Sequence, residues 1–290
     1  MLKKFPVTSF VVLTFAITWS VVLFSAATTI TGKGEQVGFL ALALVGQFGP
    51  SIAALIIMKS LYGRIGITSM LKSSVNVRQP IHLLLFAIFF FPALVTLAFS
   101  VSVLRGAPAP DITPDLLQAV ALAFLPALVI GLIFGGLSEE LGWRGFLLPR
   151  LQSKIGYMGA AIVIGFLWSA WHLYPETLAL LWTDGWDAFW VKEQATLRIY
   201  LSETISACLI MAWLFNRSKG SIFLMIVLHS SSNACVASLG VLWSERPEVW
   251  SETITWFNWT AGALFLLLAL RSPVEKLDAA QKRLGNDAES

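Results

Sequence analysis

The chain carries little charge for its length. Only 13% of its 290 residues are Asp, Glu, Lys or Arg, whereas 57% are hydrophobic. Soluble domains contain about 25% charged residues, so this composition excludes an ordinary soluble protein and predicts an integral membrane protein. The sequence has no basic stripe and no glycine-rich nucleotide loop, so we expect the lipid bilayer, and no nucleic acid, as a partner.

Cysteine and histidine are scarce, with two and three residues respectively. Cys208 and Cys235 lie in apolar segments, and we interpret them as small buried hydrophobic residues rather than as a disulfide or a metal clip. His82 is near the start of an apolar run and is interpreted as structural or interfacial. His172 and His229 lie deep inside such runs, where polar side chains are costly and usually line a polar cavity.

Eight apolar segments each approach the ~20 residues that a helix needs to cross the hydrocarbon core. They cover residues 6–30, 37–61, 81–104, 116–138, 157–175, 197–216, 221–242 and 254–271. The sequence therefore predicts an all-α polytopic fold in a single membrane domain over residues 1–290. Residues 64–79 are expected to be a cytoplasmic connection, and residues 272–290 a cytoplasmic tail.

Basic residues predict the orientation of these helices. Fourteen Lys and Arg residues flank one set of helix ends and five flank the other, with Arg144 set aside. The positive-inside rule then places both termini in the cytoplasm, and in a bacterium places the protein in the plasma membrane. An amphipathic segment is expected in the outer interface, from the helical spacing of Leu178, Leu181, Trp182, Trp186, Phe189 and Trp190. We expect its aromatic belt to continue through Trp243, Trp250, Trp256 and Trp259.

The most unusual residues follow the apolar run 116–137. Glu140 and Arg144 are four residues apart and so share one helix face, while Glu139 is turned by about 100°. At a rise of about 1.5 Å per residue, and if their helix ends near residue 148, Glu139 lies about 14 Å from the inner surface.

Two other segments bring polar side chains to a similar depth. His229 and Asn233 share a face of the seventh segment, about 12 Å deep, whereas His172 on the fifth lies deeper, at about 20 Å. We therefore expect one active site inside the helix bundle, in its cytoplasmic half and open to the cytoplasmic side.

These residue types suit hydrolysis by an activated water. A carboxylate in a dry site can act as a general base, histidine is its commonest partner, and an asparagine amide can stabilise an oxyanion. The same residues could hold a divalent metal such as zinc, through Glu139, His172 and His229, although the HExxH motif is absent. The metal-free site and the zinc site both remain open.

Each feature also has a structural interpretation. The Glu–Arg pair can be a structural ion pair, and buried histidine and asparagine side chains can join neighbouring helices. Glu203, near the outer end of the sixth segment, has no assigned role. A transporter is a further alternative, but the sequence contains no internal repeat.

Three motifs in this order resemble the CPBP family. They are Glu139-Glu140-x-x-x-Arg144, an aromatic-x-x-x-His motif ending at His172, and His229-x-x-x-Asn233. This family contains CAAX prenyl endopeptidases and bacteriocin-processing or self-immunity proteins, and the resemblance covers roughly residues 115–240. Trp168 stands where the family usually has phenylalanine and keeps an aromatic wall.

The resemblance implies a glutamate-dependent intramembrane endopeptidase that acts on a membrane-associated peptide or protein, prenylated or not. Glu139 would activate the water with help from His172. The other motif residues would stabilise the oxyanion (His229 and Asn233) or support the site (Glu140 and Arg144). The alternative is a non-catalytic peptide-binding or self-immunity protein of the same fold.

Overall fold

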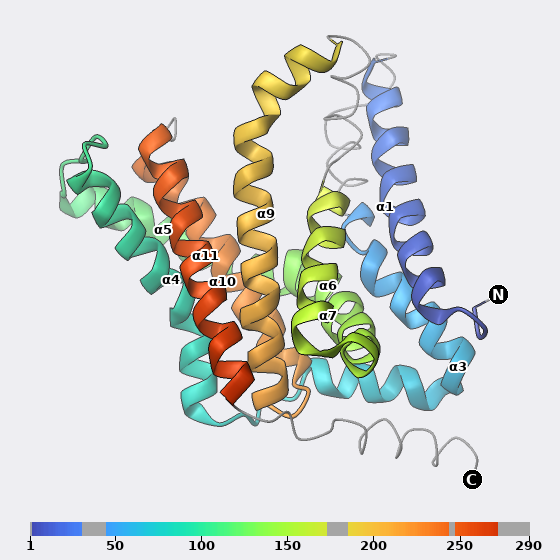
Figure 1. Ribbon diagram of the computed structural model, residues 1–290. Helices are drawn as coiled ribbons and strands as arrows, with labels where there is room; N and C mark the ends of the chain where they lie inside the picture. The colour runs from blue at the N-terminus through green and yellow to red at the C-terminus, as the bar shows by residue number, and fades with distance from the viewer. Residues whose placement is uncertain (1, 31–44, 173–184, 244–246, 272–290) are drawn as a thin grey trace.

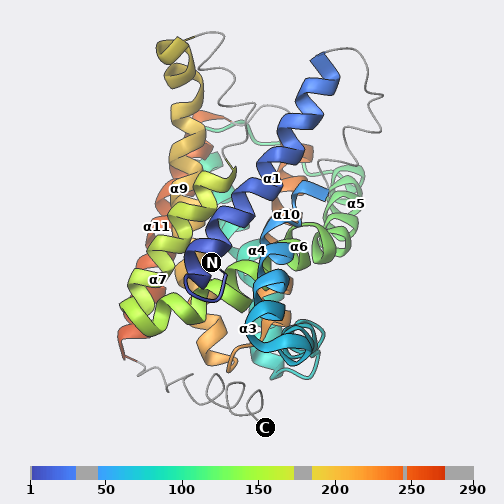
Figure 2. The same ribbon diagram turned by 90° about the vertical axis from the view of Figure 1, so that its right-hand side faces the viewer.

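The computed structural model describes residues 2–30, 45–172, 185–243 and 247–271, and every regular element within them is helical. Figures 1 and 2 show the bundle in two views. Its main helices, in chain order, are α1 (Pro6–Ile30), α3 (Gly49–Ser74), α4 (Ile81–Leu104), α5 (Pro114–Gly131), α7 (Leu148–His172), α9 (Gly185–Arg217), α10 (Ile222–Leu242) and α11 (Glu248–Arg271). Between α5 and α7 lie two π-helical stretches, Leu132–Leu137 and Leu141–Leu147, on either side of the short α6 (Ser138–Glu140).

Among the described residues, five helical runs are long and apolar enough to cross a membrane. Four of them are α3, α4, α10 and α11, and the fifth is the continuous run Pro114–His172, which contains α5, α6 and α7. This confirms the all-α polytopic membrane fold. The number of eight spans and the cytoplasmic location of both termini stay predictions.

Helix α10 lies at the centre of the bundle. Its apolar window is 67% buried, against 6% to 33% for the other spanning runs. It packs on α5 and α4, and small residues make this possible. A Cβ added at Gly131 of α5 would lie 3.3 Å from the Ser230 side chain, and Ser231 Oγ donates to the Ile88 carbonyl of α4 at 2.6 Å. Such close contacts of small and hydroxyl residues stabilise helix pairs in membranes.

The fourth predicted segment is not one continuous helix, so the expectation of a helix running on towards residue 148 is wrong. Helical geometry is lost at Phe134 and Gly135, where Gly135 has a φ of +108° that other L-residues rarely adopt. Ser138 Oγ accepts a hydrogen bond from the Gly135 N–H at 2.8 Å, and Ser51 Oγ donates to the Leu137 carbonyl at 2.7 Å. These side chains satisfy backbone groups at the break, as a low-dielectric interior requires. Residues 138–144 therefore begin a separate helical segment inside the bundle.

A second break, at Gly156, divides α7. The part after it runs to His172 and begins where the fifth predicted segment begins. Estimates of depth from helix rise hold only along one straight helix. Because the chain breaks at both Gly135 and Gly156, the extra depth estimated for His172 does not follow.

Helix α3 also differs from the sequence prediction. It continues past a break at Gly63 to Ser74, so most of the expected connection 64–79 is helical. Figure 1 shows the second half of α3 lying across the lower end of the bundle. There Ser73 Oγ donates to the Gly220 carbonyl at 3.0 Å, between α9 and α10.

The expected aromatic belt divides into buried and exposed members. Trp243 and Trp250 are 6% and 2% exposed and pack together at 5.6 Å between ring centroids, so they face the protein interior. Trp256 and Trp259 are exposed. Of the amphipathic segment, residues 178–184 lie outside the described residues, whereas Trp186 and Trp190 are exposed on the first turns of α9.

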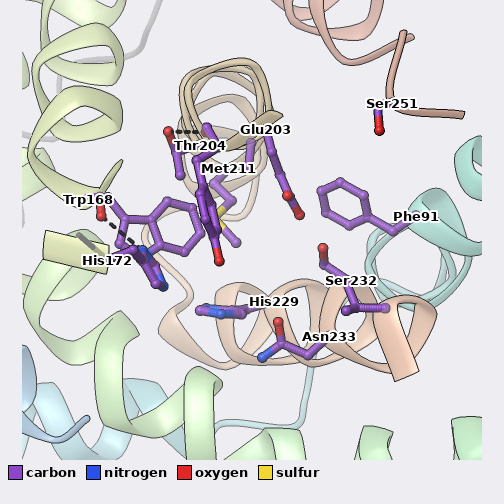
Figure 3. A pocket seen from close by; sticks show the side chains of 13 residues that line it. Phe91, Trp168, His172, Glu203, Thr204, Met211, His229, Ser232, Asn233 and Ser251 are labelled. Atoms are coloured by element: carbon purple, nitrogen blue, oxygen red, sulfur yellow. Dashed lines mark hydrogen bonds between the residues drawn. The ribbon is translucent and has the colours of Figure 1, made fainter. Parts of the chain in front are cut away.

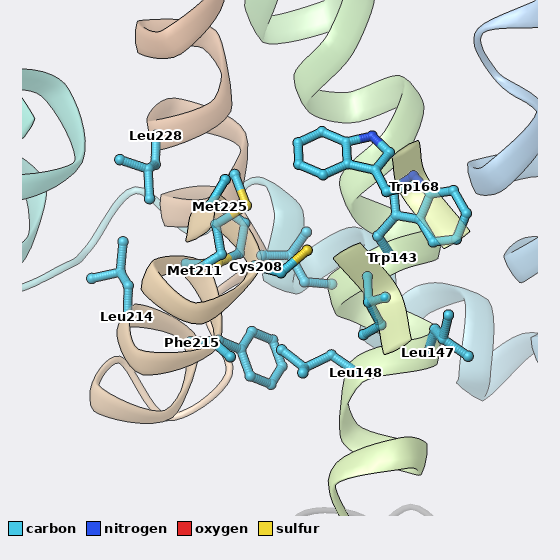
Figure 4. Packing of buried hydrophobic residues seen from close by; sticks show 14 of the residues in the cluster. Trp143, Leu147, Leu148, Trp168, Cys208, Met211, Leu214, Phe215, Met225 and Leu228 are labelled. Atoms are coloured by element: carbon cyan, nitrogen blue, oxygen red, sulfur yellow. The ribbon is translucent and has the colours of Figure 1, made fainter. Parts of the chain in front are cut away.

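Figure 4 shows how the central core forms, with side chains of α7 and its preceding turn packed on α9 and α10. Leu148 lies beside Phe215 of α9, whereas Trp143 and Leu147 lie on the other side of their segment in this view. Cys208 and Cys235 are both buried and free, as expected. This core fixes the helical segment that carries Glu139 and Glu140 against the two helices that complete the site.

Candidate active site

Glu140, Arg144 and His229 form a buried charged cluster. Arg144 Nη1 donates to Glu140 Oε1 at 2.9 Å, and His229 Nδ1 lies 2.7 Å from the same oxygen. The side chains of Glu140 and Arg144 are 0% and 1% exposed. A buried carboxylate needs strong partners, and two charge-assisted contacts supply them at Oε1, whereas Oε2 has no hydrogen-bond partner among the described residues. Glu140 therefore holds the His229 ring in a fixed orientation.

Glu139 is equally buried, but its partners are different. Trp168 Nε1 donates to Glu139 Oε2 at 2.6 Å. The other oxygen, Oε1, lies 4.0 Å from His229 Nε2, which is beyond hydrogen-bond distance. One oxygen of Glu139 is thus anchored, while the other faces the ring of His229 without a direct bond to it.

His172 lies at the end of α7, one turn after Trp168. Its Nδ1 is 2.9 Å from the Trp168 carbonyl oxygen. Because a carbonyl only accepts, Nδ1 carries the proton and Nε2 is the basic nitrogen of the neutral ring. The ring stacks on Tyr200 of α9 with centroids 5.8 Å apart and planes at 13°. Both contacts fix the orientation of the imidazole.

Gly135 brings the chain break against His229 and Asn233. A Cβ added at Gly135 would lie 2.4 Å from Asn233 Nδ2 and 3.4 Å from His229 Nε2. Any side chain at this position would therefore displace the asparagine amide. The break thus places two potential hydrogen-bond donors next to each other on one wall, and only glycine leaves them room.

Arg144 has further partners outside the ion pair. Its Nη2 donates to Cys208 Sγ at 3.1 Å, and its guanidinium carbon lies 4.5 Å from the centroid of the Trp168 ring. Cys208 is therefore more than the hydrophobic residue that the sequence predicts, because it accepts a hydrogen bond from a buried cation.

A cavity of about 530 Å³ adjoins these residues, a volume typical of ligand-binding pockets. Figure 3 shows His172, His229 and Asn233 on its wall, with Trp168 beside them. Glu203 also lines the cavity, which gives a location to the residue that had no assigned role. Glu139 and Glu140 are not among the lining residues and lie buried behind Trp168 and His229.

The described residues that line the cavity lie away from the end of the bundle that α3 covers. On α10 it runs from His229 to Val236, towards Leu242, and on α11 it includes Ser251 near the start of the helix. In the predicted orientation this is the outer end of the bundle. The expected opening to the cytoplasmic side thus has no support from the described lining.

The proposed zinc set was tested against the same geometry. Within the described ranges, no three His, Cys, Asp or Glu side chains are arranged to hold one metal ion. The residues as placed therefore do not fit a zinc ion held by Glu139, His172 and His229.

The structure brings all six candidate residues to one region. Glu139, Glu140 and Arg144 are connected to His229 directly or through Trp168, and His172 and Asn233 line the adjoining cavity. Sequence reasoning missed Gly135 and the indole N–H of Trp168. The Gly135-Gly136 pair inside an apolar run was the available signal for the first, because paired glycines often mark a break.

The fold and site define a helical membrane protein with two carboxylates, an arginine and a histidine clustered inside its bundle. Residues 121–235 match the family model described as type II CAAX prenyl endopeptidase Rce1-like. A curated relative, CAAX prenyl protease 2 of Methanococcus maripaludis, is 31% identical over 109 residues, which are 37% of this chain and 38% of the relative. The resemblance to the CPBP family is thereby confirmed for the central helices. The chain covers less than two fifths of the curated relative that it matches.

Proposed function

We propose that this protein is an intramembrane endopeptidase that hydrolyses a peptide bond of a membrane-associated peptide or protein. The observation that carries the proposal is the different environment of two adjacent carboxylates. Glu140 Oε1 is engaged by Arg144 and His229, whereas Glu139 keeps one oxygen turned towards His229 at 4.0 Å. Paired carboxylates with different partners can divide the roles of support and catalysis.

Glu139 is the general base in this mechanism. A water between Glu139 Oε1 and His229 Nε2 would contact both atoms, because their separation is too long for a direct bond and suits a bridge. Glu139 takes a proton as the water attacks the peptide carbonyl carbon. The proton then passes to the leaving amine, either from Glu139 or through His172, whose Nε2 can exchange protons.

His229 and Asn233 stabilise the tetrahedral intermediate. Both face Gly135 on the cavity wall, so the imidazole Nε2 and the amide Nδ2 can donate to one oxyanion. A doubly protonated His229 donates to Glu140 through Nδ1 and to the oxyanion through Nε2. The buried cluster is then neutral, with two carboxylates balanced by one guanidinium and one imidazolium.

The relative's name supports a CAAX-type substrate, and the cavity does not contradict it. Its wall combines apolar side chains such as Phe91 and Met211 with the polar groups of the site, which suits a peptide carrying apolar residues. We place the enzyme as a single membrane domain, with the catalytic core over about residues 115–240.

The test uses the purified protein in lipid nanodiscs with a pool of prenylated and unmodified membrane peptides, in water enriched in ¹⁸O. Cleavage should yield a new C-terminus that carries one ¹⁸O atom from the attacking water. A parallel reaction with chelator tests the metal, and undiminished cleavage there is expected from the geometry. Absence of any product across the pool would reject the proposed activity for these substrates.

A further inference from the structure

Trp168 contacts four of the five charged or titratable residues that the sequence predicts for the site, all except Glu140. Its indole N–H donates to Glu139 at 2.6 Å, and its carbonyl oxygen accepts from His172 at 2.9 Å. Its ring lies 4.5 Å from the Arg144 guanidinium carbon and packs edge-on against His229 at 5.3 Å.

Only one of these four contacts requires tryptophan. A backbone carbonyl is present in any residue, and a phenylalanine ring also offers an aromatic face to a cation and to an imidazole edge. The hydrogen bond to Glu139 needs the indole N–H, which phenylalanine lacks. A phenylalanine at position 168 would therefore keep the other three contacts and lose only the hydrogen bond to Glu139.

We propose that Trp168 is a positioning residue that assigns different roles to the two oxygens of Glu139. Its N–H holds Oε2, so the carboxylate cannot rotate, and Oε1 stays turned towards His229, where the attacking water binds. The contact between Trp168 on α7 and Glu139, 29 residues earlier, spans the chain break at Gly156. The bond therefore also fixes the catalytic segment against α7.

The electrostatic setting makes this bond strong. Glu139 is 4% and Trp168 6% exposed, and a charge-assisted hydrogen bond in a water-poor interior is shorter and stronger than a neutral one. The loss of such a bond leaves a carboxylate oxygen buried without a partner, which is costly. A rotating or displaced carboxylate would place the base incorrectly, and small misplacements in an active site lower the rate steeply.

This inference deepens the proposed function and rests on it for its kinetic test. The variant Trp168→Phe, and a chain with benzothienylalanine at position 168, both keep an aromatic ring and remove the donor. We expect kcat to fall about ten-fold to a hundred-fold with KM little changed, because a lost bond to a charged group has this magnitude. A fluorinated tryptophan at position 168 keeps the N–H and should keep kcat near the wild-type value.

Trp143 offers a matched control. It is fully buried one turn after Glu139, and in the part of the chain that the structure describes its indole nitrogen has no hydrogen-bond partner. Trp143→Phe therefore removes an indole N–H of the same kind that bonds to nothing. If both phenylalanine variants reduced kcat equally, or if neither did, the assignment of Trp168 would be overturned.

A spectroscopic measurement decides the inference without turnover. The Raman band of the indole N–H of Trp168, obtained as the difference between wild type and Trp168→Phe, should report a strong hydrogen bond. When the same subtraction is made in the Glu139→Ala background, with and without Trp168→Phe, the band should shift to the position of an unbonded indole. An unchanged band would overturn the proposal even in a protein that cleaves peptides, whereas a shifted band in an inactive protein would support it and count against the peptidase function alone.

Discussion

His229 Nδ1 lies 2.7 Å from Oε1 of Glu140, the oxygen that also accepts from Arg144 at 2.9 Å. This contact joins α10 to the segment after the Gly135 break across 89 residues of sequence. It explains why the chain has two adjacent glutamates. In the proposed mechanism, Glu140 orients the histidine and Glu139, one position earlier, acts on water.

Substitutions of Glu140 and Arg144 should affect the stability of the protein and its activity differently. Removing one partner of a buried ion pair typically costs about 3–5 kcal/mol, whereas replacing both by apolar residues of similar volume is often neutral. We therefore expect Arg144→Met alone to be strongly destabilising and Glu140→Leu with Arg144→Met to recover most of the lost stability. Thermal unfolding in detergent measures both.

Activity should not recover in the double variant, because His229 would still lack its Nδ1 partner. Equal stability losses that simply add in the double variant would mean that the two side chains are not coupled. Recovery of turnover in the double variant would show that the pair does not position His229.

Gly135 should be intolerant of any side chain. Gly135→Ala places a Cβ 2.4 Å from Asn233 Nδ2 and forces alanine into a φ of +108°. We expect turnover to fall at least about 100-fold, since a displaced oxyanion donor costs that much. The measurement is the cleavage rate with the nanodisc protein.

The variant Gly106→Ala separates the effect of backbone strain from the effect of a clash with Asn233. Gly106 has a comparable φ of +101°, and a Cβ there would meet nothing within 4 Å. This variant should lose about 1–3 kcal/mol of stability through backbone strain and keep its turnover. If it lost turnover as severely as Gly135→Ala, the clash with Asn233 would not be the cause.

Cysteine labelling tests the side from which the cavity is reached. In the predicted orientation, Ser251→Cys should react with a membrane-impermeant reagent added outside, because Ser251 lines the end of the cavity near the start of α11. Asn76→Cys, on the exposed connection between α3 and α4, should react only from inside. Cys208 and Cys235 are buried, so the parent protein gives the background.

Two results would contradict this expectation. Labelling of Asn76→Cys from outside would invert the predicted orientation of the whole chain. If both Ser251→Cys and Asn76→Cys reacted only with reagent added inside, the cavity would open to the cytoplasm, as the sequence predicts.

The sequence predicted those features of the site that depend on one helix. Glu140 and Arg144 meet at 2.9 Å because i and i+4 side chains share a helix face. His229 and Asn233 line one cavity for the same reason. The apolar segments likewise predicted the all-α membrane fold.

Features that depend on contacts between distant segments were not predicted. The indole of Trp168 reaches Glu139 across the break at Gly156, which reorients the second part of α7 relative to the segment that carries Glu139. The break at Gly135 lies inside the apolar run 116–137, where hydropathy cannot reveal it, and the sequence marked the break at Gly156 only as the start of the fifth segment. The burial of Trp243 and Trp250 was not predicted either, because tryptophan suits both a membrane interface and a packed core.

The most direct test of the account compares wild type with Glu139→Gln and Glu140→Gln, each checked for folding, by the cleavage rate of one identified membrane peptide in nanodiscs. Glutamine is nearly the same size as glutamate but cannot take a proton from water. Glu139→Gln should lose turnover by at least about 100-fold with KM little changed, since general base catalysis contributes that much. Glu140→Gln should retain measurable turnover, because its amide oxygen can still accept from His229. Glu139→Gln that cleaves at the wild-type rate would contradict the assignment of Glu139 as the catalytic base.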